Sequence, residues 1–119
     1  MNIAEEQVAN LTFVAINGRI DSNTAKALGE KLTGLIAGGR TQLIVDLERV
    51  AYISSAGFRV LLVAGGQAEA ANGILALCSL SQEIQRLFDL GAFTDLFTIY
   101  STRSNIPTNC PSRSSRCGL

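Results

Sequence analysis

The stretch Leu43–Ala64 has the sequence LIVDLERVAYISSAGFRVLLVA, and it predicts a strand and a helix on either side of two adjacent serines. Its first part, Leu43–Leu47, is a near-continuous apolar run of strand length, which suits a central strand covered on both faces. Apolar residues then recur at helical spacing from about Ala56 to Ala71, and Asn72–Gly73 follows as a stop signal. The apolar face of this helix consists of Phe58, Leu61, Leu62, Gly65 and Ala68.

The residues before this stretch predict two short strands and a first helix. Leu11–Ile16 alternates like a half-buried strand, and we expect it to end at the turn pair Asn17–Gly18. Ile3–Val8 is a weaker strand candidate, and a turn at Ala9–Asn10 would join the two strands as a hairpin. A helix is expected over Thr24–Ala37, since cap-type residues precede it and a glycine pair follows it. Its apolar face consists of Ala25, Leu28, Leu32, Leu35 and Ile36.

The residues after the stretch predict a strand, a helix and a last strand. Ile74–Cys78 is a second buried strand, and Leu96–Tyr100 is a short final one. Between them Ser81 is the expected N-cap of a helix with Ile84, Leu87 and Phe88 on one face. The order β-β-α-β-α-β-α-β predicts an α/β fold, with a mostly parallel sheet of four or five strands, mixed at one edge, and helices packed on it.

Composition and length narrow the class of protein. The 119 residues predict one domain, and the net charge of zero gives no bulk attraction to nucleic acid or an anionic membrane. The acidic start lacks the features of a signal peptide, and the longest apolar run, Val60–Ala64, is far shorter than the roughly 20 residues of a membrane span. The cysteines Cys78, Cys110 and Cys117 form no framework, which favours a reducing compartment. We therefore expect a cytoplasmic protein with no nucleic-acid or membrane partner.

The absence of histidine excludes a Ser-His-Asp hydrolase and removes the commonest metal ligand. Two thiols in the polar C-terminal segment do not make a zinc site, and Cys78 is expected to be a buried hydrophobe. Neither a G-x-x-x-x-G-K-[ST] loop nor a G-x-G-x-x-G loop is present. The sequence therefore predicts neither an enzyme nor a metal or cofactor site.

Ser54 and Ser55 lie where the central strand gives way to the second helix. One role for a serine there is capping, in which its oxygen accepts a hydrogen bond from an N–H two or three residues on. The other role is to carry or contact a phosphate, which the positive end of the helix would stabilise. Ala56 and Gly57 are small and leave the helix start sterically open to a partner or a kinase.

Three segments together resemble the STAS domain family, the anti-sigma factor antagonist and sulphate-transporter group. Leu43–Ala64 resembles the family's apolar strand, serine-containing turn and apolar helix. INGRID, Ile16–Asp21, resembles the turn before the family's first helix, and QEIQRLFDLGAFTDLFTIY, Gln82–Tyr100, resembles the segment that runs from the third helix into the last strand. The likeness covers about Val8–Tyr100 and agrees with the order of elements derived above.

The resemblance implies the antagonist branch and a phosphorylation cycle. By the family's spacing Ser55 is the phosphate acceptor, while Ser54 replaces the aspartate that usually precedes it. Asp21 either caps the first helix or helps to contact the partner. The implied partners are an anti-sigma factor that is a serine kinase of the histidine-kinase-like ATPase fold, and a serine phosphatase. The expected partner-binding residues are Asp21, Ser22, Asn23, Thr24, Ser54, Ala56, Gly57, Phe58 and Arg59.

Two further expectations concern a rival function and the boundary of the domain. The rival function is a STAS scaffold without phosphorylation, in a transport or sensory complex. Residues 1–100 are expected to form the STAS domain, and 101–119, rich in Ser, Arg, Pro and Asn, to be a disordered or non-native tail. The family usually continues with another amphipathic helix, which this tail cannot supply. A sheet left partly uncovered would favour a homodimer.

Overall fold

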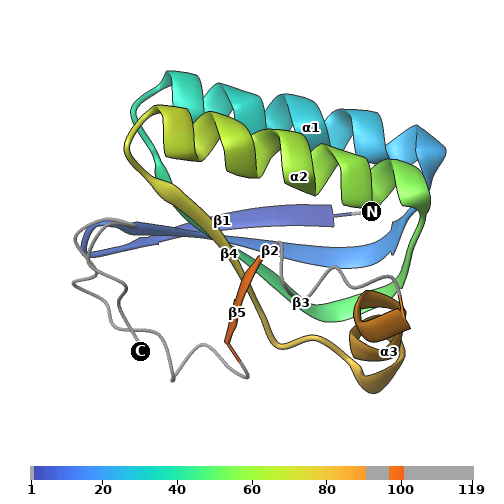
Figure 1. Cartoon of the computed structure of the whole chain (residues 1–119). Coiled ribbons are helices and arrows are strands. Elements are labelled where there is room, and N and C mark those ends of the chain that lie inside the picture. The colour runs from blue at the N-terminus through green and yellow to red at the C-terminus, as the bar shows by residue number, and fades with distance from the viewer. Residues whose placement is uncertain (1, 91–96, 101–119) are drawn as a thin grey trace.

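The computed structural model describes residues 2–90 and 97–100, in which a mixed sheet carries helices on one face (Figure 1). The strands lie side by side in chain order β1-β2-β3-β4-β5. β1 is antiparallel to β2, and all later pairs are parallel. This confirms the predicted α/β order and the sheet mixed at one edge. The elements are β1 Asn2–Val8, β2 Leu11–Ile20, α1 Ser22–Ala37, β3 Gln42–Ile53, α2 Ser55–Ala70, β4 Ile74–Cys78, α3 Gln82–Leu90 and β5 Thr98–Tyr100.

The main core lies between the sheet and the helices. α1 and α2 run side by side over one face, and α3 lies near the start of α2 (Figure 1). Phe58 of α2 and Phe88 of α3 meet edge to face with ring centroids 4.9 Å apart, an arrangement worth about 0.5–1.5 kcal/mol beyond burial. Leu28, Leu32 and Leu61 are fully buried in the same cluster. Leu43, Val45 and Leu47 of β3 belong to this same cluster, so the central strand supplies part of the core beneath the helices.

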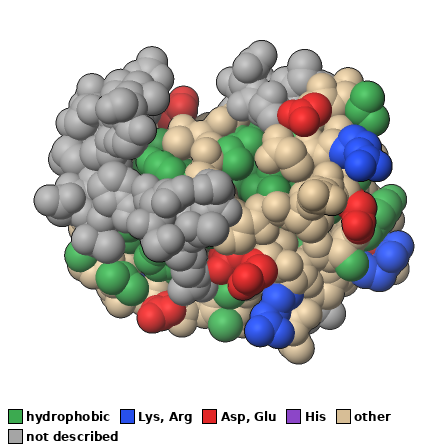
Figure 2. All heavy atoms as spheres, turned by 90° about the horizontal axis from the view of Figure 1, so that it is seen from below, with side chains coloured by type: hydrophobic (Ala, Val, Ile, Leu, Met, Phe, Trp, Pro, Cys, Tyr) green, Lys and Arg blue, Asp and Glu red, His purple; other side chains and the backbone are tan. Residues whose placement is uncertain are grey.

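The opposite face of the sheet is shown in Figure 2, where hydrophobic side chains are visible near the centre and charged ones around the edge. A smaller cluster on this side contains Leu11, Phe13, Ile44, Ala76 and Cys78. The burial of Cys78 confirms the role predicted for it. The predicted tail, residues 101–119, lies outside the described residues, so its character and the proposed domain boundary stay predictions.

The predicted end of the second strand at Asn17–Gly18 is wrong. β2 continues to Ile20, and its pairing with β3 shifts register between Ala15 and Asn17 and again between Gly18 and Arg19. Gly18 has a φ of 124°, which glycine adopts at little cost, so the turn pair bends the strand instead of ending it. This extension carries Arg19 and Ile20 alongside the end of β3.

Two buried faces also differ from prediction in detail. Leu62 is 36% exposed and Leu87 is 40% exposed, although both were assigned to the apolar faces of their helices, and Gly65 is only partly buried. In α2 the core side is completed by Ala64 instead. The segment Val60–Ala64 is apolar on every side, so its periodicity alone could not indicate which side faces the sheet.

α1 also begins two residues earlier than predicted, at Ser22, because Asp21 is its N-cap.

Candidate functional site

The candidate site lies at the edge of the sheet where β2 and β3 end and α1 and α2 begin. Ile20 pairs with Ile53 in the parallel register, and the N–H of Ser54 donates to the carbonyl of Ile20 at 2.8 Å. Since parallel strands end at the same edge, the loops that follow them lie next to each other. The sheet therefore brings Asp21 and Ser54, far apart in sequence, to one end of the molecule.

Ser54 is the N-cap of α2, and Ser55 is its first residue. The Ser54 Oγ accepts a hydrogen bond from the N–H of Gly57 at 3.2 Å, and the Ser54 backbone is extended with φ −82° and ψ 170°. Ser55 is exposed. Among the described residues no acceptor is bonded to the N–H groups of Ser55 and Ala56, and the first turn contains no acidic residue. The two roles considered for a serine are thus divided between neighbours, because one hydroxyl caps and the other faces solvent.

Gly57 allows this turn to lie directly on the strand ends. A Cβ atom at Gly57 would be 2.7 Å from Cγ2 of Ile20 and 2.9 Å from Cγ2 of Ile53, closer than real Cβ contacts. Phe58, which was assigned to the apolar face of this helix, is only 8% exposed and is packed inward. The partner contact predicted for Phe58 and Gly57 stays a prediction. These two buried residues support the turn from beneath, while Ser55 and Arg59 are exposed beside them.

Asp21 forms a complete capping box at the start of α1. Its Oδ1 accepts from the N–H groups of Asn23 and Thr24, each at 3.0 Å, and the Thr24 hydroxyl accepts from the Asp21 N–H at 2.8 Å. The Thr24 N–H holds the pKa of Asp21 below its ordinary value, and the Asn23 N–H, the Thr24 hydroxyl and the charge of Arg19 act in the same direction. Ser22 and Asn23 are exposed in this turn. Asp21 is therefore a capping residue; contact with a partner stays a prediction.

Two residues at this edge were not singled out from the sequence. The guanidinium carbon of Arg19 lies 4.5 Å from the centroid of the Tyr52 ring, and the β2–β3 register places the two residues opposite each other. Both are exposed. The available signal was the INGRID segment, but the predicted turn at Asn17–Gly18 removed Arg19 from the strand and so from the site.

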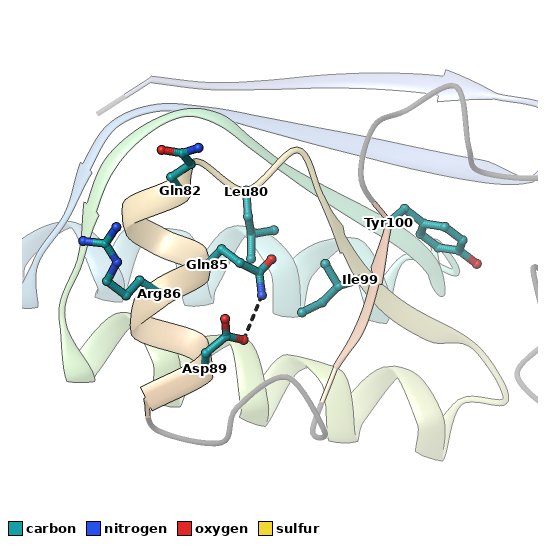
Figure 3. Close-up of a pocket in the computed structure, with 7 residues that line it drawn as sticks. All are labelled: Leu80, Gln82, Gln85, Arg86, Asp89, Ile99 and Tyr100. Atoms are coloured by element: carbon teal, nitrogen blue, oxygen red, sulfur yellow. Dashed lines mark hydrogen bonds between the residues drawn. The ribbon is translucent and has the colours of Figure 1, made fainter.

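Two hollows elsewhere contain none of the predicted site residues. One, of about 470 Å³, lies between α3 and β5, with Leu80 and Ile99 on its inner side and a hydrogen bond of 3.1 Å from Gln85 to Asp89 on its rim (Figure 3). The other, of about 390 Å³, borders Asp46, whose carboxylate accepts from the Glu48 N–H at 3.0 Å. That bond gives Asp46 a structural role within β3.

Within residues 2–90 and 97–100, no three His, Cys, Asp or Glu side chains cluster so as to hold a metal ion. No helix in the same part of the chain has the length and apolar character needed to cross a membrane.

Comparison with known proteins shows the family. Residues 2–106 match the STAS domain, and the chain belongs to that family. It is 33% identical over 99 residues to the anti-sigma-B factor antagonist of Bacillus subtilis, covering 83% of this chain and 90% of that protein. It is 28% identical over 103 residues to BtrV of Bordetella bronchiseptica, covering 87% of this chain and 89% of that one.

Solved structures agree on the fold. The Bacillus protein SpoIIAA, an anti-sigma factor antagonist, has been solved in an unphosphorylated form. That structure matches the fold of this chain with a TM-score of 0.68 and 20% sequence identity, and the match covers 87% of this chain and 91% of that chain. Its phosphorylated form gives 0.67 with 18% identity, covering 87% of this chain and 95% of that chain. The resemblance to STAS domains that the motifs indicated is confirmed.

Proposed function

We propose that this protein is an anti-sigma factor antagonist that changes partners when Ser55 is phosphorylated. Without phosphate it binds an anti-sigma factor and thereby frees the target of that factor. The anti-sigma factor is also a serine kinase of the histidine-kinase-like ATPase fold, and it transfers the γ-phosphate of ATP to the Ser55 hydroxyl with release of ADP. A serine phosphatase removes the phosphate by hydrolysis.

The observation that carries this proposal is the division of roles at the start of α2. Ser55 is exposed at the first helical position, while its neighbour Ser54 is occupied in capping. Relatives of similar length are named anti-sigma factor antagonists, and one of them exists in a phosphorylated form. Such antagonists are regulators, which supports the prediction that this chain is not an enzyme.

The electrostatics of the turn favour release of the partner without unfolding. A phosphoserine brings a charge of about −1.5 to −2, and the positive end of α2 would stabilise it by roughly 0.3–1 kcal/mol. The N–H groups of Ser55 and Ala56 are placed to contribute to that stabilisation. Inside an interface the same dianion would lose its water, which costs several kcal/mol unless the partner supplies a cation. Since about 1.4 kcal/mol is a tenfold change in affinity, one phosphate suffices to dissociate a complex.

The test is to incubate the purified protein with candidate serine kinases of this fold and ATP, and to map the product by mass spectrometry. We expect one added phosphate on Ser55 in the wild type and none in Ser55→Ala, with the Ser55→Ala protein still binding the kinase. Ser54→Ala is the matched control, and it should still be phosphorylated because its hydroxyl serves as a cap.

Two outcomes would contradict the proposal. Phosphate found on Ser54 and absent from Ser55 would overturn the assignment of the acceptor. Capture of a membrane transport complex, with no phosphorylation by any kinase that the protein binds, would instead favour the scaffold function that the sequence left open.

A further inference from the structure

We propose that Arg19 and Tyr52 form a binding element for an acidic segment of the partner, which makes them specificity-determining residues of the interface. This inference rests on the proposed function, and it adds the chemistry of the surface that the partner must present. The phosphate on Ser55 then acts partly by cancelling the positive charge on which this recognition depends.

The pair is exposed and preorganised. The Arg19 guanidinium lies over the Tyr52 ring at 4.5 Å, and Tyr52 is 38% exposed. Stacking on the ring restricts the long arginine side chain but leaves the N–H groups at the edge of the guanidinium able to form a two-bond contact with a carboxylate. Less side-chain entropy is then lost on binding, and arginine and tyrosine are enriched among the residues that dominate interface energies.

The backbone ties this pair to both loops of the candidate site. The carbonyl of Arg19 accepts a hydrogen bond from the Thr24 hydroxyl at 2.9 Å, which connects it to the cap of α1. The next residue, Ile20, accepts from the Ser54 N–H, which connects it to the cap of α2. The effect of the Arg19 charge on the Asp21 carboxyl supports the same closeness. A partner that covers Ser55 would therefore lie within reach of Arg19.

The local charge indicates an acidic partner surface. The segments 19–28 and 51–61, which form the two strand ends and the first turns of both helices, contain three cations, Arg19, Lys26 and Arg59, against the single carboxylate of Asp21. That carboxylate is engaged in capping. The whole chain has no net charge, whereas these two segments together carry three cations against one carboxylate, a net charge of plus two. A phosphoserine of about −1.5 to −2 would nearly neutralise it.

The test measures the dissociation constant and association rate for the kinase that the wild type binds, at low and high salt. Arg19→Glu should weaken binding by about tenfold or more, mainly through slower association, and the difference from wild type should shrink as salt rises. Tyr52→Phe should bind like the wild type, while Tyr52→Ala should bind more weakly. A lysine in place of the matching partner carboxylate should restore binding of Arg19→Glu.

The matched control is Arg40→Glu, because Arg40 is exposed and precedes β3 at the opposite edge of the sheet. It should bind like the wild type, and circular dichroism should show that all variants fold. If Arg19→Glu binds as tightly as wild type, or no more weakly than Arg40→Glu, while Ser55→Asp does not bind, this inference is overturned and the proposed function stands. If the wild type neither binds nor is phosphorylated by any such kinase, the proposed function fails, and this inference fails with it.

Discussion

The first turns of α1 and α2 start at the same edge of the sheet, yet their backbone N–H groups are satisfied differently. At α1 the Asp21 carboxylate accepts hydrogen bonds from two backbone N–H groups, and the Thr24 side chain accepts one from the backbone N–H of Asp21. At α2 the Ser54 hydroxyl accepts one N–H, and the first turn has no negative charge. A completed cap stabilises a helix, whereas an incomplete one leaves donors for an added anion. The difference indicates why phosphate chemistry is expected at α2 and not at α1.

The sharpest test of this comparison places the same charge at the same position of each helix. Ser55→Asp should lower partner affinity by about a hundredfold or more, because the new carboxylate must be desolvated in the interface. Ser22 is also exposed and is the first residue of α1, so Ser22→Asp should cost about tenfold or less. Calorimetric titration against the kinase measures both, and equal losses would show that the two turns do not differ in function.

The next effect concerns the close packing of α2 against the ends of β2 and β3. Gly57→Ala should lower the free energy of unfolding by about 1–3 kcal/mol, since its Cβ would overlap with Ile20 and Ile53. Gly66→Ala in the same helix has open space and should be neutral or slightly stabilising. Urea denaturation of both variants measures their free energies of unfolding. If Gly57→Ala is as stable as wild type, Gly57 is not packed closely against Ile20 and Ile53.

A smaller effect is expected from removing either cap. Ser54→Ala should destabilise the protein by about 1 kcal/mol, the usual value for one lost cap bond. Asp21→Ala should cost more, because two N–H groups lose their acceptor. Thermal unfolding at neutral pH shows which variant is less stable. A larger loss of stability for Ser54→Ala than for Asp21→Ala would contradict the view that the α1 cap is the more complete one.

The smallest effect is a pH dependence at the α1 cap. The pKa of Asp21 is lowered in the folded protein, chiefly by the Thr24 N–H. Its contribution to stability is therefore present above the unfolded pKa of about 3.9 and is lost as the pH falls through the folded value. Asp21→Asn keeps a capping oxygen without the charge, so its deficit relative to wild type should be present at pH 7 and shrink near pH 3. A deficit that does not change between these pH values would contradict this account.

Much of the fold could be predicted because the patterns are local. The Leu43–Leu47 run, the hairpin turn at Ala9–Asn10 and the strand Ile74–Cys78 all depend on short-range sequence, and the structure confirms each of them. The errors occurred where tertiary contacts decide. Gly18 bends β2 without ending it, and the apolar stretch of α2 turns Leu62 outward and Ala64 inward.

The candidate site was predicted only in part. The serine pair could be located from the strand-to-helix change alone, and the resemblance to STAS domains named Ser55 as the acceptor. The sequence could not divide capping and exposure between the two hydroxyls, because that depends on the backbone turn and on Gly57 against Ile20. It also could not place Arg19 over Tyr52, since those residues are brought together only by the parallel pairing of β2 with β3.

The amino-acid sequence by itself determined the order of the elements, the family and the position of the serines, since hydrophobic periodicity and turn chemistry are properties of neighbours along the chain. Tertiary structure alone decided which strands end together, which serine is exposed and which cation lies beside it. Those features arise from hydrogen bonds and steric contacts between segments about 30 residues apart, such as Ile20 with Ser54. Periodicity within one segment has no information on such pairs.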